Sequence, residues 1–268
     1  MSSKYTPPGD HEAEIVENLK LDDKTFLLSL CCPGIARAAE PGQFALVRPG
    51  ADKDPFLGRP LAVAAAAGDT FKMIVRVTGR GTALLASKRR GEVLTVRGPS
   101  GRGFWAARGG KPLPKRVILA GGSVGAAPLA FAARRLGSFR VERWVAGVAG
   151  EGWEGLIRWV KQEVPEAEIY SDDGTLGKKG TALSGLPASL PEDAEIWACG
   201  PAGMLKALAA KYPDQGGQVM VSLESRMACG MGGCLGCVIP TLSGSARVCA
   251  DGPVFSALEV KWDELPSL

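Results

Sequence analysis

Four cysteines near the C-terminal end constrain this chain more than any other feature of its sequence. Cys229, Cys234, Cys237 and Cys249 follow the spacing C-x4-C-x2-C-x11-C. This spacing is typical of plant-type [2Fe-2S] clusters. Glycines crowd the same segment, at positions 230, 232, 233 and 236, and glycine lets a loop fold closely around a cluster. The sequence therefore predicts four thiolate ligands and a [2Fe-2S] cluster.

The alternative for the same four residues is a zinc ion. Zinc sites usually pair two short C-x2-C motifs, whereas here the first two cysteines are separated by four residues and the fourth stands alone. Disulfides are disfavoured because the first ten residues are polar and lack the apolar core of a signal peptide. Cysteines in a chain without such a signal indicate a reducing compartment. We therefore expect an iron–sulfur protein of the cytoplasm.

Composition excludes several other classes of function. His11 is the one histidine among 268 residues, which argues against histidine-rich metal sites and Ser-His-Asp triads. The net charge is +4, but basic and acidic residues are interspersed, so no nucleic-acid partner is expected. The longest apolar stretch, near residues 61–67, is far shorter than the roughly 18 residues of a membrane helix, so no membrane association is expected.

Hydrophobic patterning divides the chain into three predicted parts. Residues 10–108 contain short apolar runs bounded by turn-forming pairs, which predicts a β-barrel or sandwich with one short helix at 83–88. Residues 113–222 alternate apolar runs with helical patterns, which predicts an open parallel α/β sheet. Residues 223–268 are cysteine-rich and irregular. The strands expected in the first part are 14–16, 25–30, 43–48, 61–65, 71–77 and 93–97; those in the second are 117–120, 143–147, 168–170, 195–199 and 218–222, with helices at 127–136, 155–164 and 202–211.

Three motifs of the second part follow predicted strands. The turn 121–125, Gly-Gly-Ser-Val-Gly, opens a helix, and a helix N-terminus is suited to a pyrophosphate. It is not a strict G-x-G-x-x-G, so an ordinary tight turn explains it equally well. Cys199-Gly200-Pro201 opens another helix, and Asp172 and Asp173 follow a third strand. Ligands of open α/β sheets bind at such carboxyl ends of strands, although the cysteine could be a small buried residue and the aspartates an ordinary turn.

Two motifs of the first part are suited to an anion. Arg59 begins an apolar strand, where it could pair with a phosphate or simply lie on the surface. Gly79-Arg80-Gly81-Thr82 leads into the predicted short helix, so backbone N–H groups and a hydroxyl are available there. Each motif is weak alone, but both precede a predicted nucleotide-binding domain.

Taken in this order, the motifs resemble the ferredoxin–NADP reductase superfamily. In that superfamily a β-barrel binds flavin and the following α/β domain binds a nicotinamide nucleotide through a glycine turn and a C-G-P motif. The segments 221–238 and 248–255, which carry the cysteines, are similar to the electron-transfer subunits of class 1B dihydroorotate dehydrogenases. The resemblance extends from residue 42 onward.

The resemblance implies a site for each cofactor. FAD would bind at Arg59, Pro60, Leu61, Ala62, Ile74, Val75, Arg76, Gly81 and Thr82. NAD, the substrate, would bind at Gly121, Gly122, Ser123, Gly125, Asp172 and Asp173, with Cys199 as a catalytic residue. Two positions depart from the family pattern: Ala62 replaces the usual serine, and Ser123 interrupts the usual run of glycines.

The resemblance also implies a function and a partner. Electrons would pass from the FMN of a dihydroorotate dehydrogenase catalytic subunit through [2Fe-2S] and FAD to NAD+, in pyrimidine biosynthesis. Two copies of each subunit would form a heterotetramer. The alternatives are the flavin and iron–sulfur subunit of another complex, ferredoxin–NADP or hydrogenase-linked, and a zinc-stapled nucleotide-binding module. We expect NAD rather than NADP because no arginine cluster suited to a 2′-phosphate follows the second strand of the α/β part.

Overall fold

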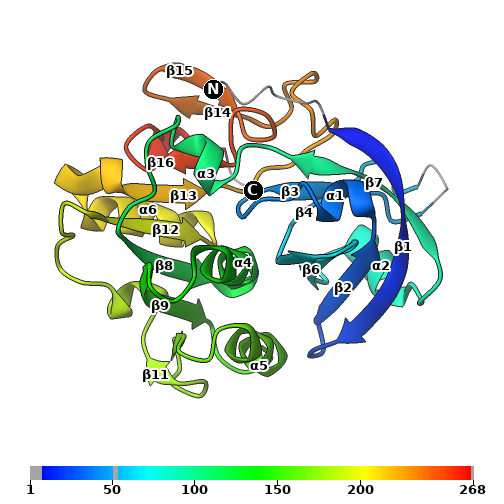
Figure 1. Cartoon of the computed structure of the whole chain (residues 1–268), viewed down its shortest axis with the longest axis horizontal. Helices are drawn as coiled ribbons and strands as arrows, with labels where there is room; N and C mark the ends of the chain where they lie inside the picture. The colour runs from blue at the N-terminus through cyan, green and yellow to red at the C-terminus, as the bar shows by residue number, and fades with distance from the viewer. Residues whose placement is uncertain (1–7, 51–53, 267–268) are drawn as a thin grey trace.

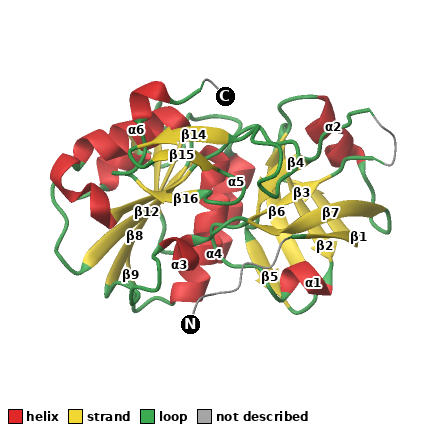
Figure 2. Ribbon diagram, turned by 90° about the horizontal axis from the view of Figure 1, so that it is seen from above, coloured by secondary structure: helices red, strands yellow, loops and turns green. Residues whose placement is uncertain are grey.

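The computed structural model describes residues 8–50 and 54–266. Its first part is an antiparallel sheet of seven strands in the order β4-β3-β7-β1-β2-β6-β5, which curls into a half-barrel (Figure 2). Three short helices accompany the sheet. The strands are β1 (Gly9–Lys20), β2 (Thr25–Cys31), β3 (Phe44–Val47), β4 (Arg59–Ala62), β5 (Ala65–Ala67), β6 (Thr70–Arg76) and β7 (Val93–Ser100), and the helices are α1 (Pro33–Ala36), α2 (Arg80–Ser87) and α3 (Phe104–Ala107).

The single strand expected at 61–65 is wrong. The chain instead forms β4 and β5 at opposite edges of the curled sheet. Val63 N donates to Gln43 O beside β3, and Ala64 N donates to Lys72 O in β6, so the chain passes from one edge to the other within two residues. The apolar run is therefore shared between two edges, which brings the curled sheet close to closure.

The second part is a sheet in the order β11-β10-β9-β8-β12-β13-β16, parallel except that β16 runs antiparallel to β13. Helices α4 and α5 lie between this sheet and the half-barrel, and α6 lies on the other face (Figure 1). The strands are β8 (Arg116–Gly122), β9 (Val141–Val148), β10 (Glu168–Ser171), β11 (Lys178–Lys179), β12 (Ala194–Cys199), β13 (Val219–Ser222) and β16 (Val254–Ser256); the α-helices are α4 (Ala126–Leu136), α5 (Glu154–Glu163) and α6 (Ala202–Lys211), and the 3-10 helices are η1 (Ser123–Gly125), η2 (Ala182–Gly185), η3 (Pro213–Gln218) and η4 (Trp262–Glu264).

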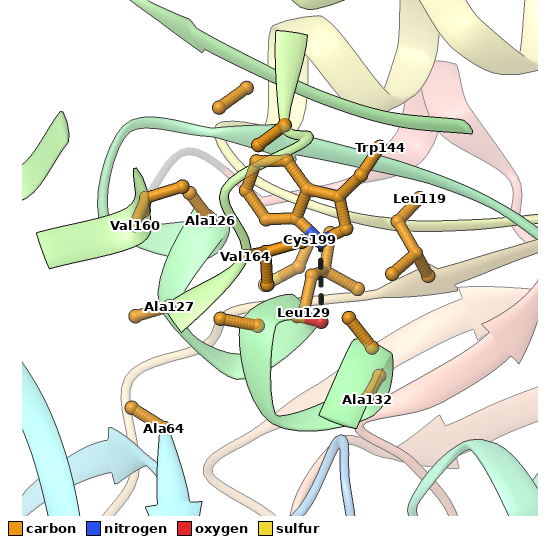
Figure 3. Packing of buried hydrophobic residues seen from close by; sticks show 14 of the residues in the cluster. Ala64, Leu119, Ala126, Ala127, Leu129, Ala132, Trp144, Val160, Val164 and Cys199 are labelled. Carbon is orange, nitrogen blue, oxygen red and sulfur yellow. Dashed lines mark hydrogen bonds between the residues drawn. The ribbon is translucent and has the colours of Figure 1, made fainter. Parts of the chain in front are cut away.

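The two parts share one hydrophobic core. Strands β2 and β6 are buried on both faces: Leu28 and Met73 pack inside the half-barrel, whereas Leu27 and Ile74 belong to the cluster around α4. Almost every residue of α4 is buried because it lies between the two sheets. In Figure 3 the indole of Trp144 lies against α4, and its N–H donates to Leu129 O at 3.4 Å. Burial on both sides explains why β2 and β6 carry apolar side chains on both faces.

The C-terminal part is more regular than expected. Strands β14 (Val238–Thr241) and β15 (Gly244–Arg247) form an antiparallel hairpin, and β16 then returns to complete the second sheet. The predicted architecture of a flavin-type barrel, an α/β sheet and a cysteine-bearing subdomain is confirmed, while the boundaries 10–108, 113–222 and 223–268 stay a prediction. Within the described ranges, no helix is both long and apolar enough to cross a membrane.

Candidate cofactor sites

A cleft of about 390 Å³ lies between the half-barrel and the parallel sheet. One wall comes from β4 and β6, and the opposite wall from the start of α4 and from residues 222–227. Eight of the residues expected to hold FAD line this cleft: Arg59, Pro60, Leu61, Ala62, Ile74, Val75, Arg76 and Thr82. The structure therefore brings residues of three separate segments together on one wall. The volume of the cleft is suited to part of a dinucleotide.

Gly81 contributes to this wall indirectly. A Cβ at Gly81 would overlap the guanidinium of Arg59, so the absence of a side chain leaves room for the arginine. Arg59 donates to Leu57 O, which holds its guanidinium near the start of α2. The helix begins at Arg80, three residues earlier than expected, because Thr82 Oγ1 accepts from Thr78 N at 3.0 Å and from Gly79 N at 3.2 Å. A guanidinium beside a helix N-terminus is suited to a phosphate.

Arg76 lies where the two parts meet. Its guanidinium carbon is 3.7 Å from the centre of the Trp153 ring, and its Nη1 donates to Thr25 Oγ1 at 3.0 Å. Trp153 immediately precedes α5, so this cation–π contact joins the half-barrel to the nucleotide-binding sheet. Arg76 therefore lines the cleft and also connects the two parts.

The glycines of the turn after β8 serve close packing. A Cβ at Gly121 would lie 2.7 Å from Ala126 Cα, and one at Gly122 would lie 2.5 Å from Met204 Sδ. A Cβ at Gly125 would overlap the carbonyl of Cys199, and Gly125 is the one member of the predicted set Gly121, Gly122, Ser123 and Gly125 that lines the cleft. Ser123 adopts a left-handed φ of 52°, a conformation that glycine adopts without strain.

Cys199 lies in the floor of the cleft at the end of β12. Burial, together with the nearby Glu224, raises the pKa of its thiol to about 12, so the thiol is neutral at physiological pH. A neutral buried thiol is a poor nucleophile. Its side chain hydrogen-bonds with Ser222 at the end of β13, and its catalytic role stays a prediction.

Asp172 and Asp173 do not line the cleft. Both follow β10 and are exposed. Asp173 Oδ1 accepts from Thr175 N at 2.9 Å and from Thr175 Oγ1 at 2.7 Å, and these bonds hold the pKa of the carboxyl below its usual value. Asp173 thus contacts its own turn and the neighbouring segment at Gly150 and Glu151, and a role of either aspartate in binding NAD stays a prediction.

Sequence reasoning missed a third segment of the cleft. Ser222, Glu224, Ser225, Arg226 and Met227 line the wall opposite the half-barrel. Desolvation raises the pKa of the Glu224 carboxyl. The signal was available: strand 218–222 was expected, and ligands bind at the carboxyl ends of such strands.

The four predicted ligands lie as two pairs of thiols. The Cys229 thiol hydrogen-bonds with that of Cys234, and the Cys237 thiol with that of Cys249. Among residues 8–50 and 54–266, no three His, Cys, Asp or Glu side chains converge as one ion would require. A zinc ion takes all its ligands at one centre, whereas a [2Fe-2S] cluster takes two thiolates at each of two irons. The paired arrangement fits the cluster.

Backbone N–H groups point at the sulfurs. Met231 N donates to Cys229 Sγ at 3.5 Å, Gly232 N to Cys249 Sγ at 3.1 Å, and Cys249 N to Cys237 Sγ at 3.4 Å. Burial opposes ionisation of Cys229, but hydrogen bonds from Met231, Cys234 and Gly233 lower the pKa of its thiol to about 6. Burial and the adjacent Cys237 raise the pKa of Cys249 to about 12. Such N–H donors stabilise thiolates bound to iron.

The shape of this loop depends on glycine and on one ion pair. Gly230 and Gly232 have φ values of 67° and 85°, and a Cβ at Gly230 would lie 3.2 Å from Leu46 Cδ2 of the half-barrel. Arg247 donates to Gly232 O at 3.2 Å and forms two hydrogen bonds of 2.9 Å with Asp251. The loop is thus held between the half-barrel and the C-terminal hairpin.

Comparison with known proteins agrees with this geometry. Residues 224–261 match the family described as the iron-sulfur cluster binding domain of dihydroorotate dehydrogenase B. The chain is 28% identical to a chain of the NADH-dependent reduced ferredoxin-NADP oxidoreductase structure, with a TM-score of 0.80 over 99% of this chain and 93% of that one.

Two curated relatives match over nearly their full lengths. The electron transfer subunit of dihydroorotate dehydrogenase B (NAD(+)) from Desulforamulus reducens is 32% identical over 94% of this chain and 98% of its own. A homolog of that subunit from Aquifex aeolicus is 36% identical over 92% of this chain and 97% of its own. The chain therefore belongs to the family of electron-transfer subunits of NAD(+)-dependent dihydroorotate dehydrogenase B.

Proposed function

We propose that this protein is the subunit that passes electrons from a dihydroorotate dehydrogenase catalytic subunit to NAD+, by way of a [2Fe-2S] cluster and FAD. One observation carries the proposal. The segment that forms the far wall of the cleft ends at Met227, and the first predicted iron ligand, Cys229, follows two residues later. One short stretch of chain therefore connects the cluster loop to the cleft in which FAD and the nicotinamide would meet.

The bound FAD supplies the chemistry that links single electrons from the cluster to a hydride given to NAD+. The chain's own residues bind and orient the groups. Arg59 and the start of α2 hold the phosphates, and β4 and β6 present an apolar wall of Leu61 and Ile74 to the ring. Cys199 and Gly125 line the opposite side, where a neutral thiol would face the nicotinamide without adding charge.

The partner is an FMN-containing catalytic subunit, and two copies of each chain form the complex. Exposed apolar side chains beside the predicted iron ligands support a docked partner. Met231 and Leu235, which flank Cys234, are 40% and 62% exposed. Apolar side chains in a loop that must exchange electrons are typical of a contact surface.

A reconstitution tests the proposal. The full chain, loaded with FAD and iron, is mixed with an FMN-containing dihydroorotate dehydrogenase catalytic subunit, and NAD+ reduction is followed on adding dihydroorotate. We expect a stable complex with two copies of each chain and coupled activity, with NAD+ preferred over NADP+. The chain alone should transfer electrons from NADH to artificial acceptors and leave dihydroorotate unchanged.

A variant of the chain tests the role of the cluster separately from that of FAD. A Cys234→Ser chain in the same complex should keep the NADH-to-dye activity, which needs FAD alone, and lose dihydroorotate-dependent NAD+ reduction. If the wild-type chain forms no complex and instead reduces ferredoxin at the expense of NADH or NADPH, it serves a different reductase complex, and the proposed partner is wrong.

A further inference from the structure

Arg97 is a side chain of the half-barrel that reaches the cluster loop. It lies in β7, far in sequence from the cysteines, yet its Nη1 donates to Cys229 O at 2.9 Å and is 3.8 Å from Met231 Sδ. In Figure 1 the orange loop that carries the cysteines lies beside β1 and β7. The side chain of Arg97 is only 17% exposed. A partly buried cation therefore lies next to the first predicted iron ligand.

The other edge of the same guanidinium is occupied by Asp10. Asp10 is the cross-strand partner of Arg97 in the β1–β7 pair. Arg97 Nε and Nη2 donate to its two carboxylate oxygens at 2.8 and 2.7 Å. This bidentate pair raises the pKa of Arg97 and lowers that of Asp10. Both groups are therefore ionised at physiological pH, with Asp10 on the edge of the guanidinium away from Cys229.

We propose that Arg97 is a positioning residue that fastens the cluster loop to the flavin-binding half-barrel, and that the Arg97–Asp10 pair sets the reduction potential of the cluster. A cluster held by four thiolates becomes more negative when it accepts an electron. A nearby cation stabilises the reduced form and raises the potential, whereas a nearby carboxylate lowers it. The two members of the pair therefore act in opposite directions, and Arg97 acts more strongly because it is nearer.

The opposite signs separate this role from a merely structural one. Arg97→Gln removes the positive charge and leaves Asp10 uncompensated, so the potential should fall. Asp10→Asn leaves the positive charge unopposed, so the potential should rise by a smaller amount. The potential of the double variant should lie between those of Arg97→Gln and the wild type. Arg97→Lys keeps the charge and should recover most of the potential that Arg97→Gln loses.

The experiment is a redox titration of the full chain loaded with FAD and the cluster, followed by the electron paramagnetic resonance signal of the reduced cluster. At the wild-type midpoint we expect Arg97→Gln to lower the ratio of reduced to oxidised cluster at least threefold, which corresponds to about 28 mV for one electron. Arg37→Gln is the matched control, because Arg37 forms a similar pair with Asp69 at the surface of the half-barrel. The reduction potential of the cluster in Arg37→Gln should equal that of the wild type.

The inference is overturned if Arg97→Gln and Asp10→Asn shift the reduction potential of the cluster in the same direction, or if neither variant shifts it. If Arg97→Gln does not fold, Asp10→Asn and Arg97→Lys decide: a rise in the first with little change in the second supports the inference, and any other pattern refutes it. The inference rests on the proposed cluster but not on its partner. A chain that binds no iron defeats the proposed function, whereas iron-loaded variants with unchanged potentials defeat this inference alone.

Discussion

At the scale of single residues, the four predicted iron ligands differ in their surroundings. Cys237 and Cys249 are buried, whereas Cys234 is exposed at the outer side of the loop. Positive φ values occur around it, at Gly230, Gly232 and also at Leu235, which has a φ of 59°. Non-glycine residues rarely adopt this conformation, so the loop keeps a shape that local preferences disfavour. We attribute that shape to the cluster that the loop encloses.

Substitution of Cys234 tests the ligand assignment. A serine oxygen is a harder ligand than a thiolate and is rarely ionised, so Cys234→Ser should lose the cluster and its visible absorbance. FAD should be retained, because its predicted residues lie in the half-barrel. Visible spectra and an iron assay provide the measurement, with Cys31→Ser of β2 as the control. Stoichiometric iron in Cys234→Ser would show that this residue is not a ligand.

Arg59 is the residue on which flavin affinity should depend most. If its guanidinium pairs with a phosphate, Arg59→Ala removes a charge-assisted hydrogen bond worth about 1.5–3 kcal/mol. The dissociation constant of FAD should then rise by about one to two orders of magnitude. Fluorescence titration of the apoprotein measures this constant, and Arg37→Ala serves as an exposed control. Equal affinities for the two variants would place Arg59 outside the phosphate site.

At the scale of elements, the predicted nucleotide site lies where two strand-to-helix turns touch. The turn from β8 to α4 contacts the turn from β12 to α6, with Gly125 against Cys199 and Gly122 against Gly200. Backbone meets backbone at this point, so neither neighbour could move aside for a side chain. The glycines thereby determine how far apart the two turns lie.

Gly125→Ala should disturb that spacing. Gly125 has a φ of −63°, which alanine adopts easily, so the added Cβ acts only through its overlap with the carbonyl of Cys199. Overpacking of this kind costs about 1–3 kcal/mol. We expect lower stability and weaker NADH binding, measured by thermal unfolding and by KM with an artificial acceptor. Gly203→Ala is the control, since its Cβ would meet open space; an equal loss in both variants would contradict the explanation.

At the scale of the whole molecule, the two sheets form one structural unit around α4. Their shared core contains Leu27 and Ile74 of the half-barrel and Leu129 of α4. At the edge of this core, Arg76 stacks on Trp153, and a Cβ at Gly155 would overlap the backbone of Leu21. The width of the cleft therefore depends on contacts at the base of the interface as well as on the residues that line it.

Trp153→Leu should loosen this interface. It removes a partly desolvated cation–π contact and leaves a smaller apolar side chain, which together should cost about 2–4 kcal/mol in the free energy of unfolding. Trp153→Phe keeps a ring beneath Arg76 and should lose less than half as much. Denaturant unfolding gives the values. Phe139→Leu, which removes an exposed ring near Arg140, should change stability by less than about 0.5 kcal/mol.

Sequence alone determined those features that depend on short-range spacing. The cysteine spacing indicated a [2Fe-2S] cluster, because ligand separation along one loop limits the geometry that the loop can form. The continuous apolar run of β8 and the helical pattern of α4 similarly indicated an α/β sheet. The strands and helices expected in residues 113–222 lie within a few residues of those in the structure, because their apolar patterns are clear, whereas the two-residue strand β11 is not expected from the sequence.

Only the tertiary structure decided which distant residues meet. It divided the apolar run after Arg59 between two sheet edges, since local pattern does not specify a pairing partner. It added residues 222–227 to the cleft between the two parts and left Asp172 and Asp173 outside that cleft. It also placed Arg97 against Cys229, a contact across 132 positions. No local signal carries such a contact, because it depends on how two sheets pack around a shared core.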